Sequence, residues 1–308
     1  MKRKNYVIGV DGGGTKTIAA LADLEGNILK QVRSGPSNLR NLGIEKATDN
    51  IAKAITKVRK DVDKENILLV TIGLAAVEEE FKKEKGKIKR VVSEKIEISS
   101  SKIKILSDQL VAFKSGTDKK DGVVLISGTG AVCHGWFHRR EAKVSGWGWL
   151  NDEGSGFWAG QRGFQTIFKE LDGRGEKTLI RDLVFKQFEV KNKEELMAKI
   201  YRKDFVRNVS SISVSIDKAA RKGDKIAKEI FREAAKELAN SAKQVIKKLN
   251  IEKESFPLVF VGKMFESNII LEGVKKEIKK VAPDAEFIRP EKEAVTGAVK
   301  LAVEEILK

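Results

Sequence analysis

Residues 11–16 are the part of the sequence best suited to bind a phosphate. The segment reads, in order, Asp11, Gly12, Gly13, Gly14, Thr15 and Lys16. Glycines can take backbone angles closed to other residues, so the chain can double back tightly here. Their N–H groups can also lie directly against an anion, because no Cβ atom stands in the way. The acid can hold Mg²⁺ through water, while Thr15 and the backbone amides face phosphate oxygens.

The segments on either side of these glycines predict a strand–turn–strand unit. Residues 6–10 form a β-branched, apolar run that is typical of a strand buried on both faces. Residues 15–23 show partial alternation and no helical stripe, which predicts a second strand. A dinucleotide fingerprint and a P-loop both need a helix after the glycines, so both are excluded. A hairpin turn without any ligand remains the alternative.

A second glycine turn follows about two fifths of the way along the chain. Residues 123–126 read as a strand, Ser127-Gly128-Thr129-Gly130 as a turn, and residues 131–137 as another strand. A third strand over 142–145 completes the same order that residues 6–32 show. This internal repeat predicts two related domains, each offering a phosphate loop to one cleft.

Asp108 is the candidate for a catalytic base. It follows a predicted strand at 103–106 and precedes a predicted helix at 109–114. Ligands of such sheets sit outside the strand ends, and phosphoryl transfer needs a carboxylate that accepts the proton of the attacking hydroxyl. An Asp in this position is also a common helix N-cap. The sequence leaves both roles open.

Hydrophobic spacing predicts the order β-β-β-α-β-α-β-α, followed by a restart of the pattern. The remaining predicted strands cover 28–32, 67–73, 256–261 and 285–288. Helices are predicted over 45–62, from Glu78, and over 155–171, 178–188, 194–201, 206–222, 225–249, 266–281 and 291–307. The predicted domains are residues 1–116 with 290–308, and residues 117–289.

Composition excludes several classes of protein. At 308 residues with 41% hydrophobic residues, the chain can bury two ordinary cores. No apolar run approaches the roughly 20 residues that cross a bilayer, and no signal peptide is recognisable at the start, so we expect a cytoplasmic protein that does not engage membranes. The single cysteine, Cys133, excludes an internal disulfide.

The formal charge of +16 does not by itself indicate a nucleic-acid partner. The 60 Lys and Arg residues are spread along the chain together with 44 Asp and Glu residues. No aromatic residues interleave with the basic runs, as a single-strand binder would require. We therefore expect no nucleic-acid binding. Abundant Lys and Glu with few Cys and Met suggest a thermophile.

Several motifs together resemble the N-acetylglucosamine kinase family of the actin-like ATPase superfamily. The matching segments are residues 10–17, 35–38, 107–108, 126–130, 146–148, 151–158 and 297–298. They span essentially the whole chain in the family's order. The chain is also similar to archaeal hexokinases and glucosamine kinases, and to activator ATPases. The resemblance implies a two-domain actin-like (ribonuclease H-like) α/β fold with a cleft between the domains.

The resemblance implies an ATP- and Mg²⁺-dependent kinase that phosphorylates the 6-hydroxyl of an amino sugar or hexose, as a homodimer. Asp108 would accept the hydroxyl proton, and Asp11 would hold Mg²⁺ through water. The implied nucleotide-binding residues are Asp11, Gly12, Gly13, Gly14, Thr15, Lys16, Gly128, Thr129, Gly130, Gly262 and Lys263. The implied sugar contacts are Asn38, Ala76, Asp108, Thr129, Trp147, Asp152 and Glu153.

Two alternatives share the same fold. An activator-type ATPase couples hydrolysis to electron delivery through an iron–sulfur cluster, to which each subunit supplies more than one cysteine; this chain has one. A non-catalytic sugar sensor would need neither Asp11 nor Asp108. An assay of ADP release with and without sugar separates the three functions.

Overall fold

The computed structural model describes residues 4–75, 77, 81–202 and 204–308. Its contacts divide the chain into two compact units. The first comprises residues 1–119 and 289–308, and the second comprises residues 120–288. We call them the N-terminal unit and the C-terminal unit and describe each by itself.

The N-terminal unit is built on a five-stranded sheet in the order β3-β2-β1-β4-β5. The strands are β1 (Tyr6–Gly12), β2 (Thr17–Ala22), β3 (Ile28–Ser34), β4 (Ile67–Leu74) and β5 (Ile103–Ser107). β1 and β2, and β2 and β3, pair antiparallel, whereas β1, β4 and β5 run parallel. The carboxyl ends of β1, β4 and β5 therefore meet at one edge of the sheet.

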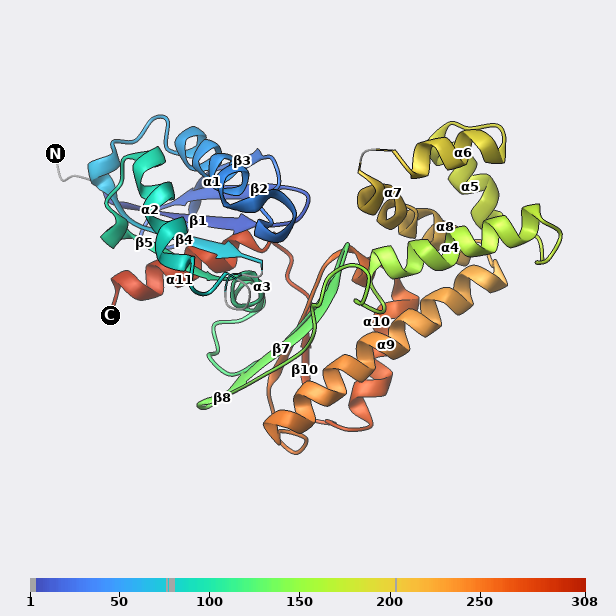
Figure 1. Ribbon diagram of the computed structural model, residues 1–308. Coiled ribbons are helices and arrows are strands. Elements are labelled where there is room, and N and C mark those ends of the chain that lie inside the picture. Colours follow the sequence, from blue (N-terminus) through green and yellow to red (C-terminus); the bar gives the residue numbers. More distant parts are fainter. Residues whose placement is uncertain (1–3, 76, 78–80, 203) are drawn as a thin grey trace. The chain divides into compact units, whose positions relative to one another are not determined.

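Helices cover both faces of this sheet (Figure 1). They are α1 (Leu39–Val58), α2 (Lys85–Ile96), α3 (Asp108–Gly116) and α11 (Val295–Ile306). One core joins α1 and α2 to the face that carries Ile8 and Val10 of β1. A smaller core joins α11 to the opposite face, which carries Val7 of β1 and Ile18 of β2. The alternation along β1 thus gives a strand buried on both faces, as the apolar run predicts.

The C-terminal unit repeats this sheet topology. Its order is β10-β9-β6-β7-β8, with β6, β7 and β8 antiparallel and β6, β9 and β10 parallel. The strands are β6 (Gly122–Ser127), β7 (Ala131–Phe137), β8 (Arg140–Ser145), β9 (Pro257–Val261) and β10 (Glu286–Ile288). The predicted duplication is confirmed. In the second copy a run of helices stands between the third and fourth strands.

Those helices form the larger core of the chain. They are α4 (Gly156–Leu171), α5 (Leu179–Phe188), α6 (Lys193–Ile200), α7 (Phe205–Ser211), α8 (Ser213–Arg221) and α9 (Lys225–Leu249), with α10 (Asn268–Lys279) after β9. The long α9 packs on β7 and β8, and α10 packs on α9. α9 places its apolar residues at helical spacing, so one stripe of it is buried from Ala227 to Leu249.

The structure corrects the bounds of several predicted helices. The helix predicted over 206–222 is two helices, α7 and α8, which meet at Ile212. The last helix begins at Val295 and not at residue 291. α1 begins at Leu39, earlier than predicted, because Asn38 caps it, and it contains a non-helical Gly43. The described part of the helix predicted from Glu78 begins at Lys85, and residues 78–80 lie outside the described residues.

In the part of the chain that the structure describes, none of the helices combines the length and the apolar character needed to cross a membrane.

Candidate functional site

The first glycine turn joins β1 to β2, so the predicted strand–turn–strand unit is confirmed. The turn is closed by a hydrogen bond from the Gly13 N–H to the Lys16 carbonyl, at 3.0 Å. None of the three glycines has a φ in the left-handed region. The expectation that the turn needs glycine for unusual backbone angles is therefore wrong. A Cβ atom on Gly12 would lie 2.6 Å from both the Leu74 side chain and the Ser37 hydroxyl. Close packing of the Leu74 and Ser37 side chains therefore favours glycine at this position.

Asp11 lies at the end of β1 with its carboxyl partly buried. Burial raises the pKa of Asp11 to about 6; the Lys16 ammonium lowers it and the Glu293 carboxylate raises it. No described group donates a hydrogen bond to this carboxylate. A partly buried carboxylate with a raised pKa beside a glycine turn is typical of a functional site.

Asp108 is the first residue of α3, and it does not cap the helix. The cap is Ser107, whose hydroxyl accepts a hydrogen bond from the Leu110 N–H at 3.2 Å. The Asp108 carboxylate instead accepts a hydrogen bond from Nε2 of Gln109 at 2.7 Å. Capping therefore does not account for the carboxylate at position 108.

The sheet register places Asp11 and Asp108 at the same edge. Asp11 pairs with Gly73 of β4, and Gly73 pairs with Leu106 of β5. Adjacent strands lie about 4.8 Å apart, so β1 and β5 are separated by about 10 Å. One edge of the N-terminal unit thus carries a glycine turn and two carboxylates.

The segment 35–38 packs against the first glycine turn. The Ser37 N–H donates to the Gly13 carbonyl at 3.0 Å, and the Thr17 hydroxyl donates to the Ser37 hydroxyl at 2.8 Å. Asn38 follows as the N-cap of α1, and its Oδ1 accepts from the Arg40 and Asn41 N–H groups. Because Oδ1 is committed to the helix, a sugar contact by Asn38 would have to use its amide nitrogen as a donor.

The second glycine turn, Ser127–Gly130, is held by the N-terminus of α4. The Gly156 N–H donates to the Gly128 carbonyl at 2.7 Å, and the Phe157 N–H donates to the Thr129 carbonyl at 3.2 Å. These bonds satisfy helix N–H groups that have no partner within the helix. The Thr129 side chain makes no hydrogen bond among the described residues and remains available to a ligand.

Asp152 joins this turn to the loop 145–148. Its Oδ2 accepts from the Ala131 N–H at 3.2 Å, and its Oδ1 accepts from the Gly146 and Gly148 N–H groups at 3.1 and 3.2 Å. The residue is 4% exposed. Burial raises the pKa of Asp152, and the backbone N–H groups oppose that rise. The carboxylate therefore organises two loops, a role that the sequence did not indicate.

Gly262 brings the end of β9 against the same turn. Its φ is +113°, and a Cβ atom there would lie 2.1 Å from the Ser127 carbonyl oxygen. Only glycine fits this close approach. Lys263 follows with an exposed side chain. The C-terminal unit thus gathers Gly128, Thr129, Gly130, Asp152 and Gly262 around one turn.

The other predicted sugar contacts have different surroundings. Trp147 stands at the tip of the loop that Asp152 holds and is 76% exposed. Glu153 is exposed beside Asp152. Ala76 lies outside the described residues. Their predicted roles in sugar binding stay predictions.

The residues around Asp11 fit a magnesium ion bound mainly through water and phosphate. Asp11 offers one carboxylate without hydrogen-bond partners at the glycine turn. No group of three or more His, Cys, Asp or Glu side chains suited to a metal occurs among the described residues. Mg²⁺ in phosphoryl-transfer sites usually uses one or two carboxylates and keeps several waters, so this donor set is sufficient.

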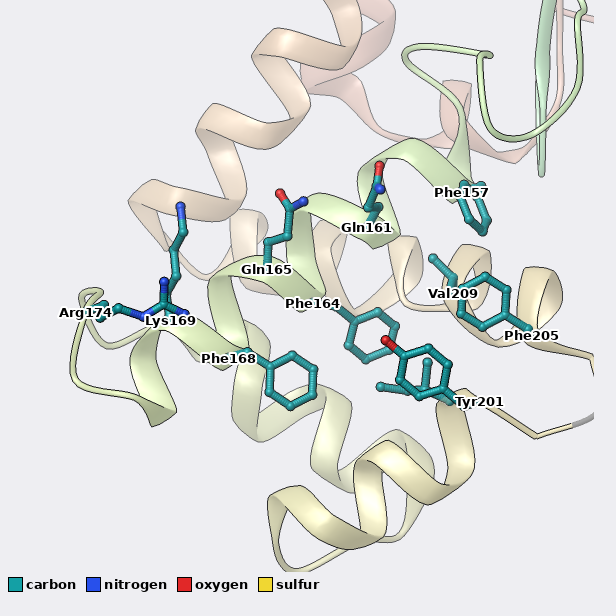
Figure 2. Close-up of a pocket in the computed structure, with 11 residues that line it drawn as sticks. Phe157, Gln161, Phe164, Gln165, Phe168, Lys169, Arg174, Tyr201, Phe205 and Val209 are labelled. Atoms are coloured by element: carbon teal, nitrogen blue, oxygen red, sulfur yellow. The ribbon is translucent and has the colours of Figure 1, made fainter.

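A cavity lies in the helical part of the C-terminal unit (Figure 2). It has a volume of about 560 Å³ and is lined from α4, α6 and α7. Phe164, Phe168, Tyr201 and Phe205 face one another across it. None of the predicted site residues lines it, and neither does any acid. A proton acceptor is therefore missing from its walls, so it does not suit phosphoryl transfer.

Comparisons with known proteins show which family the chain resembles. The profile of the BadF/BadG/BcrA/BcrD ATPase family matches residues 8–302. The chain is 29% identical to the N-acetylmuramic acid/N-acetylglucosamine kinase of Clostridium acetobutylicum, over 96% of this chain and 98% of that protein. It is 32% identical to the N-acetyl-D-glucosamine kinase of Dictyostelium discoideum, over 97% and 98%.

Among solved structures, a protein from Chromobacterium violaceum proposed to be an N-acetylglucosamine kinase superposes with a TM-score of 0.76. The identity is 20%, and the alignment covers 98% of this chain and 99% of that one. This likeness, with the duplicated sheets, confirms the actin-like α/β fold class. The chain belongs to the BadF/BadG/BcrA/BcrD ATPase family, as a homologue of its N-acetylglucosamine kinases.

Proposed function

We propose that the chain is an ATP-dependent kinase that phosphorylates the 6-hydroxyl of an amino sugar or hexose, with N-acetylglucosamine as the first candidate. The observation that carries the proposal is the edge of the N-terminal sheet. Three features occur together there: the first glycine turn, the carboxylate of Asp108, which does not cap α3, and the carboxylate of Asp11, which accepts no hydrogen bond from a described residue. The two relatives described above, both named for N-acetylglucosamine, support the choice of sugar.

In the proposed reaction, Asp108 accepts the proton of the sugar hydroxyl as its oxygen bonds to the γ-phosphorus of ATP. The bond from that phosphorus to the bridging oxygen breaks, and ADP leaves. Backbone N–H groups of the two glycine turns, Thr15, Thr129 and Lys16 stabilise charge on the phosphate oxygens. A Mg²⁺ held near Asp11 would neutralise further phosphate charge.

Sugar recognition in this proposal uses the residues that the family resemblance implies. Asn38 donates from its amide nitrogen, because its oxygen caps α1. Asp152 and Glu153 supply carboxylates, and Trp147 supplies an aromatic face. Gly262 and Lys263 lie at the adenosine. The proposal also includes a cytoplasmic homodimer and a thermophilic source, which rest on the family resemblance and on composition.

The test is ADP release by the purified protein with Mg·ATP and a panel of sugars that differ at carbon 2. The panel contains glucose, glucosamine, N-acetylglucosamine and N-acetylmannosamine, with N-acetylmuramic acid added because one relative is named for it. Sugar-dependent ADP release with a 6-phosphate product supports the proposal. Equal release without sugar would indicate an activator-type ATPase, and sugar binding without release would indicate a sensor; either result overturns the proposal.

A further inference from the structure

Glu293 connects the first glycine turn to a distant part of the chain. It lies in the segment between β10 and α11, and its carboxylate accepts from the Lys16 ammonium at 2.7 Å and from Nη2 of Arg33 at 3.0 Å. Nε2 of Gln31 donates to its other oxygen. Of these residues only Lys16 belongs to the predicted site. Lys16 and Glu293 are 277 residues apart in sequence.

The register of the N-terminal sheet explains why these groups meet. Asp11 lies opposite Ile18, and Ile18 lies opposite Arg33, so the three share one face. Gln31 is two residues from Arg33 on β3 and points to the same face. That face is the one that α11 covers, since Ile18 packs in the core of that helix. Glu293 lies just before α11 in sequence and therefore lies over the same face of the sheet.

Hydrogen bonds hold both the backbone and the carboxylate of Glu293. The Thr296 N–H and hydroxyl donate to the Glu293 carbonyl at 3.0 and 2.9 Å, which holds its backbone. Burial works to raise the pKa of Glu293, but the bonds from Lys16 and Gln31 outweigh it, so the net shift is downward and the group is ionised at neutral pH.

Stability alone does not explain this cluster. The Lys16 and Glu293 side chains are 45% and 34% exposed. An ion pair at such exposure contributes about 0–1 kcal/mol to folding. A free lysine side chain loses about 2 kcal/mol of rotamer entropy when it is immobilised. Holding Lys16 in advance therefore matters most for a ligand that needs the ammonium in one place.

We propose that Glu293 is a positioning residue for nucleotide binding, which acts by holding the Lys16 ammonium beside the first glycine turn. The inference rests on the proposed function, because it needs a nucleotide phosphate at that turn. Glu293 touches neither substrate; Lys16 makes the contact. Arg33 and Gln31 keep the Glu293 carboxylate in place beside Lys16.

The test compares Glu293→Ala, Lys16→Ala and the double variant. The Kd for Mg·ADP, from calorimetry, and the KM for ATP are measured for each variant. We expect each single variant to raise the Kd and the KM by about tenfold, because one charge-assisted contact is lost. The double variant should bind Mg·ADP no more weakly than Lys16→Ala does, because Glu293 acts through Lys16. The KM for the sugar should stay within about twofold of wild type in Glu293→Ala, because Glu293 touches no sugar in this proposal.

Glu305→Ala is the matched control. Glu305 lies on α11, is 37% exposed, and pairs with Lys104 at 2.9 Å, away from the turn. It should leave Mg·ADP binding unchanged. Glu293→Gln, which keeps the shape and the acceptor oxygen, should lose less binding than Glu293→Ala and guards against misfolding of the latter.

Unchanged or tighter Mg·ADP binding in Glu293→Ala overturns the inference, as do additive effects in the double variant. Tighter binding would mean that Glu293 competes with the phosphate for Lys16. If the wild type binds Mg·ADP but shows no sugar-dependent turnover, the kinase proposal fails while the binding comparison still decides the role of Glu293. If the wild type binds no nucleotide, both fail.

Discussion

At the scale of single residues, Ser107 caps α3, and Asp108 is the proposed catalytic base. The carboxylate of Asp108 is therefore not the cap of the helix. We expect Asp108→Asn to lower kcat by about 10²–10⁴, because a general base is lost. Its unfolding midpoint and its affinity for Mg·ADP should match wild type.

The neighbouring Ser107→Ala should give the reverse pattern. Loss of the cap costs about 1 kcal/mol of stability, while kcat falls far less than in Asp108→Asn. Thermal unfolding and sugar-dependent ADP release measure the two effects. Near wild-type turnover by Asp108→Asn would refute its assignment as the base.

Asp11 gives a prediction about pH. Burial raises its pKa from 3.8 to about 6 in the folded chain. The folded state therefore binds the proton more tightly than the unfolded chain, and ionisation of Asp11 costs stability as pH rises through that range. The full shift corresponds to at most about 3 kcal/mol. We expect Asp11→Asn to unfold at a higher temperature than wild type at about pH 7.5, and the gain to shrink toward about pH 4.5.

The measurement is thermal unfolding without nucleotide and with a chelator present. Asp61→Asn is the control, because its exposed carboxylate pairs with Lys30 at 2.8 Å and its pKa is lowered. That variant should show a small effect of the opposite sign. A gain for Asp11→Asn that does not vary with pH would contradict the explanation by burial.

At the scale of elements, the end of β9 and the second glycine turn depend on each other. A Cβ atom on Gly262 would lie 2.1 Å from the Ser127 carbonyl oxygen. We expect Gly262→Ala to destabilise the fold by about 2–4 kcal/mol, from backbone strain together with steric overlap. It should also weaken Mg·ADP binding, because the turn must shift.

Gly223→Ala is the control that separates backbone strain from steric overlap of the added Cβ atom. Gly223 has a φ of +97° and nothing within 4 Å of an added Cβ. It should cost about 1 kcal/mol through strain alone and leave nucleotide binding unchanged. Equal losses of stability in the two variants, measured by denaturant unfolding, would show that the contact between Gly262 and Ser127 is unimportant.

At the scale of the whole molecule, a ligand that binds only the folded chain must stabilise it. With Mg·ADP at about 100 times its Kd, the free energy of unfolding should rise by about 2.7 kcal/mol. A chelator should remove most of this gain, since in the proposed site Asp11 would contact the nucleotide only through the metal. The measurement is the unfolding midpoint against nucleotide concentration, with and without chelator. A chelator-resistant gain would argue against a metal at Asp11.

The sequence by itself determined the features that depend on neighbouring residues. Alternation and β-branched runs define both strand–turn–strand units, and their recurrence predicts the duplicated sheets. The error at the last helix has a local cause. Pro290 is typical of a first helical turn, but the chain forms helix only from Val295. The break between α7 and α8 at Ile212 carries no proline or glycine that would have predicted it.

Only the tertiary structure decided which distant groups share one site. Asp152 accepts backbone N–H groups from two separate loops, and Glu293 reaches Lys16 across 277 residues. Spacing along a sequence carries no information about such partners, because sheet register and helix packing set their positions. Residue types thus predicted the chemistry of this chain, while the fold determined which carboxylates remain available for it.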